Sequence, residues 1–170
     1  MNRTTLLDYV ARSRACQSYL EIGCNRDGTF QQVAIPQRVG VDPKRGGTLR
    51  MTSDEFFAVN QQSFDLVFID GLHLREQVLR DVENALRVLS PHGCIVIHDC
   101  LPTERQQQLR EPAGGGEPWT GDVWKAVVEL RQRPDLDIAV LDADWGWVCY
   151  SHDRTPRLWP IPGNWTGKFL

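Results

Sequence analysis

The sequence lacks the features that would indicate a membrane, a secretory route or a nucleic-acid partner. No apolar run in its 170 residues approaches the ~20 residues that a membrane-spanning helix requires. The first residues, Met1–Thr5, are polar and supply no apolar segment of a signal peptide. Lys and Arg number 19 against 22 Asp and Glu, which gives a net charge of −3 without a basic cluster. We therefore expect a cytoplasmic protein without a membrane or nucleic-acid partner.

The number and spacing of the cysteines disfavour the usual cysteine-based frameworks. The five cysteines are odd in number and never form a C-x-x-C pair, which disfavours both a disulfide scaffold and a zinc site. We expect reduced, mostly buried thiols. The length predicts one domain over residues 1–170, which would bury roughly 70% of its unfolded surface.

The stretch from Tyr19 to Gly28 organises the rest of the chain. A short apolar segment leads into Glu21, and glycines follow at positions 23 and 28. This order predicts a buried strand, a tight turn and the start of a helix, as in a nucleotide-binding crevice.

Two better-known phosphate motifs do not fit this turn. Asn25 stands where the dinucleotide fingerprint requires glycine, and Thr29-Phe30 replace the Lys-Ser/Thr of the P-loop. The carboxylates of Glu21 and Asp27 disfavour phosphate but suit a ligand that carries an ammonium, a sulfonium and a ribose diol, such as S-adenosylmethionine. A plain strand-to-helix turn, with Asn25 or Asp27 as a helix cap, is the alternative.

Strand-like and helix-like segments alternate along the chain. Helical patterns cover 4–14 (an N-terminal helix within 1–15), 28–34, a short segment from 52, 74–89 and 123–131. Strand patterns cover 18–23, 38–43, 48–51, 64–69, 94–97, 138–141 and 147–150, the last two as a hairpin. The alternation predicts an α/β, Rossmann-like, doubly wound and mostly parallel sheet with an antiparallel C-terminal hairpin in a three-layer α/β/α arrangement.

Two segments lie outside this pattern. Residues 101–120 are rich in Pro, Gly and Gln, which indicates a lid-like loop, and residues 154–170 form an aromatic tail. Trp119 and Trp145 fall on loops where they would face an acceptor, whereas we expect Trp124 and Trp147 in the core. The tail's tryptophans would pin it to the domain or pack against a second copy of the chain in a homodimer.

Four predicted strands end in an acidic residue: Glu21, Asp42, Asp70 and Asp99. The carboxyl ends of parallel strands are where such sheets bind ligands. Asp42 follows Gly23 by 19 positions, close to the ~20 expected for an acid that binds ribose hydroxyls. Sheet packing alone does not account for four acids at these positions, and we interpret them as a ligand site.

Three segments in this order resemble the class I S-adenosylmethionine-dependent methyltransferases. They are Glu21-Ile22-Gly23, Ile69-Asp70-Gly71-Leu72-His73 and Ile97-His98-Asp99, and the resemblance covers roughly residues 18–150. It implies S-adenosylmethionine as cofactor, with Glu21 and Gly23 at its methionine moiety, Asp42 at the ribose, and Ser53 and Asp54 near the adenine. The cofactor-binding set that we predict is Glu21, Gly23, Asn25, Gly28, Asp42, Ser53, Asp54 and Asp70.

The resemblance also places two carboxylates side by side, since strand 64–69 would neighbour both 18–23 and 94–97. Asp70 and Asp99 would then repel each other unless a divalent cation such as Mg²⁺ lay between them. We predict a metal site made of Asp70, His98 and Asp99. The alternative is structural: Asp70-Gly71 makes a turn and Asp99 caps the next segment.

His73 and Asp99 are the predicted catalytic residues. The unperturbed pKa of a histidine lies near neutrality, so His73 suits a general base that removes the acceptor's proton. Its alternative is a structural contact with backbone at the strand end. His92 and His152 are expected in solvent.

We therefore predict an enzyme that methylates a small-molecule acceptor, most simply at a hydroxyl of a sugar or an aromatic metabolite, with metal assistance. One alternative is a non-catalytic cofactor-binding module that acts with a protein partner through the aromatic tail. Another, a nicotinamide-dependent oxidoreductase, is disfavoured by Asn25 and Glu21.

Overall fold

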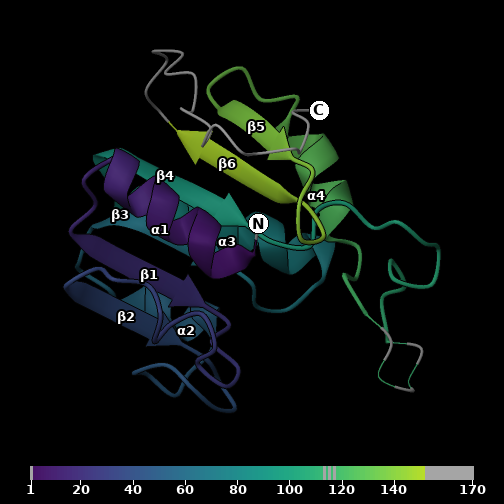
Figure 1. Ribbon diagram of the computed structural model, residues 1–170, viewed down its shortest axis with the longest axis horizontal. Helices are drawn as coiled ribbons and strands as arrows, with labels where there is room; N and C mark the ends of the chain where they lie inside the picture. Colours follow the sequence, from purple (N-terminus) through teal and green to yellow (C-terminus); the bar gives the residue numbers. More distant parts are fainter. Residues whose placement is uncertain (1, 113, 115, 117, 152–170) are drawn as a thin grey trace.

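The computed structural model describes residues 2–112, 114, 116 and 118–151 (Figure 1). Within them, strands form one sheet in the order β2-β1-β3-β4-β6-β5. The parallel strands are β1 (Ser18–Ile22), β2 (Gln37–Val41), β3 (Phe64–Ile69) and β4 (Leu89–Ile97). The antiparallel pair β5 (Asp137–Leu141) and β6 (Trp147–Ser151) extends the sheet beyond β4. This arrangement confirms the predicted fold class.

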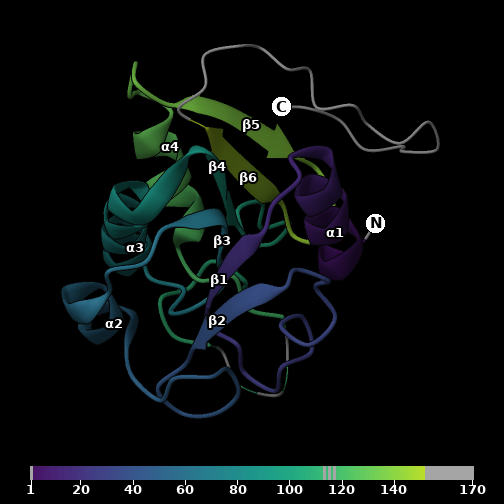
Figure 2. The ribbon, with the colours of Figure 1, turned by 90° about the vertical axis from the view of Figure 1, so that its left-hand side faces the viewer.

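Three helices cover one face of the sheet: α2 (Ser53–Val59), α3 (Arg75–Val88) and α4 (Val123–Leu130), as Figure 2 shows. The apolar residues of α3 recur at helical spacing, and Val78, Val82 and Ala85 are all buried. They belong to a cluster that includes alternate residues of β1 and β3. Burying each of the two valines contributes on the order of 1.5–3 kcal/mol, which helps to hold α3 to the sheet.

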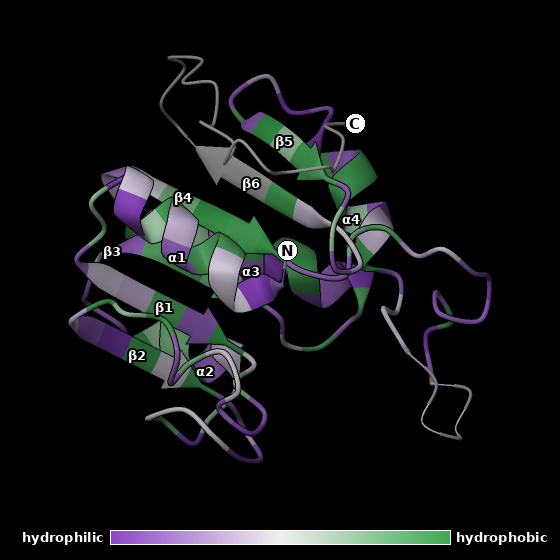
Figure 3. Ribbon diagram, viewed as in Figure 1, coloured by the Kyte–Doolittle hydropathy of each residue, from purple (hydrophilic) through white to green (hydrophobic). Residues whose placement is uncertain are grey.

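The opposite face carries α1 (Arg3–Ser13). Leu6, Leu7 and Val10 of this helix pack into a second cluster, which contains the other alternate residues of the central strands and Trp147. The strands β3 and β4 are hydrophobic along most of their length because both faces are covered (Figure 3). Trp147 lies in the core as predicted, whereas Trp124 is only half-buried.

Three local predictions are wrong. Residues 28–34 form successive turns instead of a helix, and Phe30, Val33 and Ile35 pack into the α1 cluster; tertiary packing decides this segment. The expected strand 48–51 is reduced to a single bridge between Val41 and Leu49. The strand predicted at 94–97 is longer, because β4 begins at Leu89, where the helix 74–89 was expected to end. Its pairing with β3 shifts register after Phe64.

The structure also bears on the predictions about cysteine burial, His92 and membrane character. Cys16, Cys24, Cys94 and Cys100 are buried, as expected. His92 is exposed. None of the helices among the described residues combines the length and the apolar character needed to cross a membrane. The tail 154–170 and His152 lie outside the described residues.

Candidate active site

The carboxyl ends of the parallel strands meet in one row. Ile22 pairs with both Val41 and Ile69, and Ile69 pairs with Ile97, so the four strands end level. The chain leaves β1 towards β2 on one side, whereas β3 continues to β4 on the other. The gap between β1 and β3 is therefore the point where strand order reverses, the usual ligand position in such sheets.

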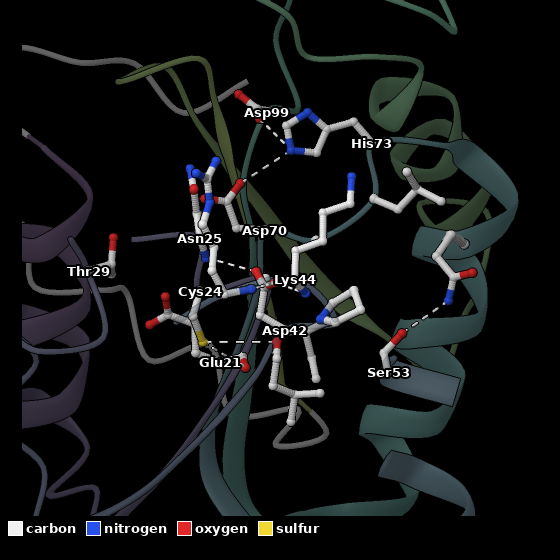
Figure 4. A pocket seen from close by; sticks show the side chains of 18 of the residues that line it. Glu21, Cys24, Asn25, Thr29, Asp42, Lys44, Ser53, Asp70, His73 and Asp99 are labelled. Carbon is white, nitrogen blue, oxygen red and sulfur yellow. Dashed lines mark hydrogen bonds and ion pairs between the residues drawn. The ribbon is translucent and has the colours of Figure 1, made fainter. Parts of the chain in front are cut away.

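A pocket of about 810 Å³ lies at this edge (Figure 4). All of the predicted cofactor-binding residues line it: Glu21, Gly23, Asn25, Gly28, Asp42, Ser53, Asp54 and Asp70. His73 and Asp99, the predicted catalytic residues, line it as well, whereas His98 does not. The volume lies in the range typical of cofactor and small-molecule sites.

The turn after β1 explains why glycine stands at position 23. Gly23 has φ +90°, and a Cβ atom there would lie 2.3 Å from the carbonyl oxygen of Asp70. Asn25 and Asp27 also have positive φ, which these two residue types tolerate better than most. Asp27 Oδ1 accepts a hydrogen bond of 2.5 Å from the backbone N–H of Gly47, which ties the turn to the loop after β2.

Asp42 is a buried carboxylate held by backbone donors. It accepts hydrogen bonds from the backbone N–H groups of Asn25, Lys44 and Arg45 at 2.8–2.9 Å. Burial opposes ionisation, but these donors outweigh it and hold the pKa of Asp42 below its usual range. The side chain is therefore an ionised acceptor of fixed orientation. About four acceptor positions exist on a carboxylate, so roughly one remains for a ligand hydroxyl.

Glu21 has the opposite character. Glu21 is only 1% exposed, and the hydroxyl of Tyr19 donates a hydrogen bond of 2.6 Å to its Oε2. Burial, reinforced by the nearby charges of Asp70 and Asp27, raises the pKa of Glu21 to about 8. A cationic group of a ligand would stabilise the ionised form of this carboxyl.

Ser53 and Asp54 open α2 at the far end of the pocket. Thr52 caps the helix and forms a reciprocal capping box with Glu55. Gln77 of α3 donates to Ser53 Oγ at 3.2 Å, and its Nε2 lies 3.3 Å from Asp54 Oδ1. Gln77 was not predicted as a site residue. The feature that could have revealed it is a polar residue next to Val78 on the buried side of α3.

The side of the pocket opposite Ser53 contains a cluster of Asp70, His73 and Asp99 (Figure 4). His73 Nε2 lies 3.2 Å from Asp99 Oδ2 and 3.6 Å from Asp70 Oδ1. Burial lowers the pKa of His73, but the hydrogen bond to Asp70 and the charge of Asp99 raise it more, so the net shift is upward. Asp99 adopts φ +60°, a conformation that aspartate tolerates better than most residues.

His98 lies beneath this cluster, with a side chain that is only 1% exposed. Its Nδ1 is 3.3 Å from an oxygen of each of Asp70 and Asp99, and its Nε2 lies 2.7 Å from the carbonyl oxygen of Asp144. Although burial opposes protonation, the two carboxylates raise the pKa of His98 to about 9. Both ring nitrogens therefore donate, and His98 supplies a positive charge to the carboxylates.

This geometry bears on the predicted metal set of Asp70, His98 and Asp99. The donor atoms that converge, all within 4.8 Å of one another, belong to Asp70, His73 and Asp99. The two carboxylates are close, as predicted, but the histidine beside them in the pocket is His73.

Two residues that reach this side of the pocket, Arg3 and Asp144, were not predicted as site residues. Arg3 of α1 places Nη1 2.8 Å from Asp70 Oδ2, and its Nε lies 3.7 Å from Asp144 Oδ2. Trp119 stacks on His73 with ring centroids 5.0 Å apart. Trp119 and Trp145, expected on acceptor-facing loops, both line the pocket. Nothing in the sequence pattern linked Arg3 or Asp144 to this site, because they reach it from distant parts of the chain.

Comparison with known proteins gives an independent line of evidence. A family model described as a methyltransferase domain matches residues 20–100. A search of curated protein sequences found no significant match. Among solved structures, the S-adenosylhomocysteine-bound methyltransferase PaMTH1 from Podospora anserina is 18% identical, with a TM-score of 0.61 over 88% of this chain and 77% of that one.

Two O-methyltransferase structures are similarly close in fold. TomG from Streptomyces achromogenes, in complex with S-adenosylmethionine, is 16% identical with a TM-score of 0.64 over 88% of this chain and 78% of that one. The enzyme from Bacillus cereus, in complex with S-adenosylhomocysteine, is 13% identical with a TM-score of 0.62 over 89% and 82% of the two chains. The match to the methyltransferase model over residues 20–100 and the order of the sheet together support a class I S-adenosylmethionine-dependent methyltransferase.

Proposed function

We propose that this methyltransferase acts on a hydroxyl group of a small acceptor, an aromatic metabolite or a sugar, with the help of a divalent cation. The observation that carries the proposal is the convergence of Asp70, His73 and Asp99 at the strand ends, next to the residues predicted to bind the cofactor. Trp119 and Trp145 line the same part of the pocket, and aromatic faces suit planar or sugar rings. Solved structures of similar fold include enzymes described as O-methyltransferases.

The cofactor occupies the β1–β2 side in this proposal. Asp42 accepts a hydrogen bond from the ribose diol, and Ser53 and Asp54 lie by the adenine. Glu21 and the Gly23 backbone, with Asn25 and Gly28, border the methionine moiety. The raised pKa of Glu21 supports this orientation, because the ammonium and sulfonium groups of the cofactor would repay the cost of ionising a buried carboxyl.

The carboxylates of Asp70 and Asp99 fit a hard cation such as Mg²⁺, which binds proteins through one or two carboxylates and keeps open positions for water and substrate. When bound, such a cation would lower the pKa of an acceptor hydroxyl. His98 and Arg3 already contact Asp70, so they set the charge that a cation would meet there.

His73 is the proposed general base. Its Nδ1 lies 3.1 Å from the carbonyl oxygen of Trp119, an arrangement in which Nδ1–H donates and Nε2 faces the carboxylates and the pocket. Once deprotonated, Nε2 can accept the acceptor's hydroxyl proton while the oxygen attacks the methyl group in line with the sulfur. Asp99, at 3.2 Å from Nε2, stabilises the imidazolium that forms.

The test is methyl transfer from S-adenosylmethionine to a panel of hydroxylated aromatics and sugars, with added Mg²⁺ or excess chelator. We expect O-methylated product and at least a tenfold loss of rate in chelator, since metal assistance contributes several kcal/mol in comparable sites. Full activity in chelator would remove the cation from the proposal. Product methylated at nitrogen or carbon would overturn O-methylation.

A further inference from the structure

Asp122 connects three separate parts of the molecule, although it does not line the pocket. Its side chain is 2% exposed. Oδ1 accepts a hydrogen bond of 2.7 Å from the backbone N–H of Arg75, and Oδ2 accepts one of 2.8 Å from Arg110 Nη1. Its own backbone N–H donates to the carbonyl oxygen of His73 at 3.1 Å. A buried carboxylate with this many partners fixes the elements that supply them.

The first of these elements is the start of α3. Leu74 occupies the N-cap position and makes no side-chain capping bond. Asp122 supplies the missing acceptor from a distant segment, and its charge suits the positive end of the helix. His73 immediately precedes this cap, so its backbone position depends on the same carboxylate.

The second element is the loop 101–120. Arg110 joins it to Asp122 and to Glu76 of α3. Gln107, which is buried, accepts from the backbone of Thr103 through Oε1 and from Thr120 through its carbonyl oxygen, so the two ends of the loop are tied together. The described part of the loop is thereby held against the N-terminus of α3.

The third element is the contact between this loop and the His73 ring. Trp119 stacks on the ring, and its carbonyl oxygen pairs with Nδ1. The indole N–H of Trp119 donates to the carbonyl oxygen of Leu109, next to Arg110, at 2.6 Å. Gly121 lets the loop approach closely, since a Cβ atom there would lie 1.9 Å from the His73 carbonyl oxygen.

We propose that Asp122 and Arg110 are positioning residues for methyl transfer: they anchor the loop so that Trp119 sets the orientation and the tautomer of the His73 ring. The inference rests on the proposed role of His73 as general base. It assigns to the loop a part in catalysis beyond covering the pocket. A misplacement of a catalytic group by about 1 Å lowers the rate by up to about 100-fold, so loss of the Arg110–Asp122 contact should lower kcat.

The test compares Arg110→Met with Arg105→Met in the full chain. Met keeps the apolar stem but removes the charge, and Arg105 is an exposed arginine of the same loop for which no ion pair occurs among the described residues. Arg110→Lys serves as the conservative rescue, and Asp122→Asn removes the charge while keeping an acceptor for Arg75. Nitrogen NMR of ¹⁵N-histidine-labelled protein, recorded at a pH at which the ring is neutral, reports the His73 tautomer directly, without an acceptor.

We expect Arg110→Met to lower kcat by about tenfold and to shift the His73 ring signals towards a tautomer mixture. Its affinity for S-adenosylhomocysteine, measured by calorimetry, should not change. Arg105→Met should match the wild type, and Arg110→Lys should recover part of the loss. Unchanged His73 signals in a folded Arg110→Met protein would overturn the inference, even if its Tm falls.

The two proposals fail in different ways. If the wild type methylates no hydroxylated acceptor, the proposed function fails, while the NMR comparison still decides whether Arg110 sets the His73 tautomer. If the wild type is active and Arg110→Met has the same kcat and the same ring signals, only the positioning role is rejected.

Discussion

The two ends of the pocket are built in different ways. At the proposed cofactor end, Asp42 is fixed by backbone donors from its own turn and from the neighbouring turn after β1. At the proposed acceptor end, Asp70 contacts Arg3 of α1 and His73 contacts the loop 101–120, while the β5–β6 connection contacts His98 beneath them. The cofactor end is thus largely a property of the sheet, whereas the acceptor end is assembled from distant segments.

This difference predicts separate roles for the two ends, cofactor binding at one and catalysis at the other. A common cofactor can be bound by groups that the fold itself orients, since strand ends and their turns are rigid. Acceptor selection and catalysis then depend on loops that can vary without disturbing the sheet. Substitutions should therefore separate binding of the cofactor from turnover, depending on the end at which they are made.

The largest expected effect is at the acceptor end. We expect His73→Gln to reduce kcat by about 100-fold or more, the usual contribution of a general base. Its affinity for S-adenosylhomocysteine should stay close to that of the wild type, because the groups proposed to hold the cofactor lie at the other end. Steady-state rates and calorimetry measure the two quantities, and His92→Gln, at an exposed histidine, is the control. Equal losses of kcat and of S-adenosylhomocysteine affinity in His73→Gln would contradict the separate roles of the two ends.

The next effect is at the cofactor end. Asp42→Asn should weaken S-adenosylhomocysteine binding by about tenfold to a hundredfold, since a hydrogen bond to a charged group contributes about 1.5–3 kcal/mol. The kcat at saturating cofactor should change little. Asp65→Asn is a matched control, because Asp65 also accepts backbone N–H groups, but near the amino end of β3, away from the pocket. An equal loss of affinity in both variants would mean that the effect comes from folding.

A third prediction concerns Glu21 and pH. The folded-state pKa of about 8 lies above the ordinary 4.5, so the native state holds this proton more tightly than the unfolded chain. Its burial therefore costs nothing below pH 4.5 and destabilises progressively as pH rises towards 8. Glu21→Gln should have a Tm close to that of the wild type at low pH and a Tm higher by several degrees above pH 8, at about 2–4 °C per kcal/mol.

The same variant should bind S-adenosylmethionine more weakly, because it lacks the carboxylate that would face the cofactor's cationic groups. Thermal melts across this pH range, with and without cofactor, measure both effects. Parallel pH profiles for the variant and the wild type would show that Glu21 ionises normally.

The smallest effect is expected for Arg3→Met. Arg3 is 37% exposed at its side chain, so losing its ion pair with Asp70 should change the free energy of unfolding by less than about 1 kcal/mol. Affinity for Mg²⁺ should rise, because the guanidinium competes for the same carboxylate. Denaturant unfolding and Mg²⁺ titration measure these changes, with the exposed Arg12 of the same helix as a control in Arg12→Met. Weaker Mg²⁺ binding would show that Arg3 supports the cation site.

The contrast between the two ends also explains which features of the site could be predicted from the sequence. Hydrophobic runs ending in Glu21, Asp42, Asp70 and Asp99 locate the sheet edge, since strand order brings those ends together. The helix expected at 28–34 fails because packing of Phe30 against α1 overrides local propensity.

The residues that contact this cluster from distant parts of the chain could not be predicted in this way. Arg3, Trp119 and Asp144 come from a helix, a loop and a hairpin turn, and no spacing rule links them to Asp70 or His73. The predicted metal set contains His98, whereas the histidine that lines the pocket is His73. Which histidine faces the pocket depends on side-chain direction at the strand end, and a sequence pattern does not reveal it.

The most direct test of the central claim is a thermal melt with S-adenosylhomocysteine or NAD, for the wild type and for Asp42→Asn. At about a hundred times the dissociation constant, a ligand stabilises the native state by ~2.7 kcal/mol. At about 2–4 °C per kcal/mol, the account predicts a rise of several degrees for the wild type with S-adenosylhomocysteine, a smaller rise for the variant and none with NAD. No rise with S-adenosylhomocysteine, or an equal rise in both proteins, would contradict the assignment of the cofactor to the acid-ended strands.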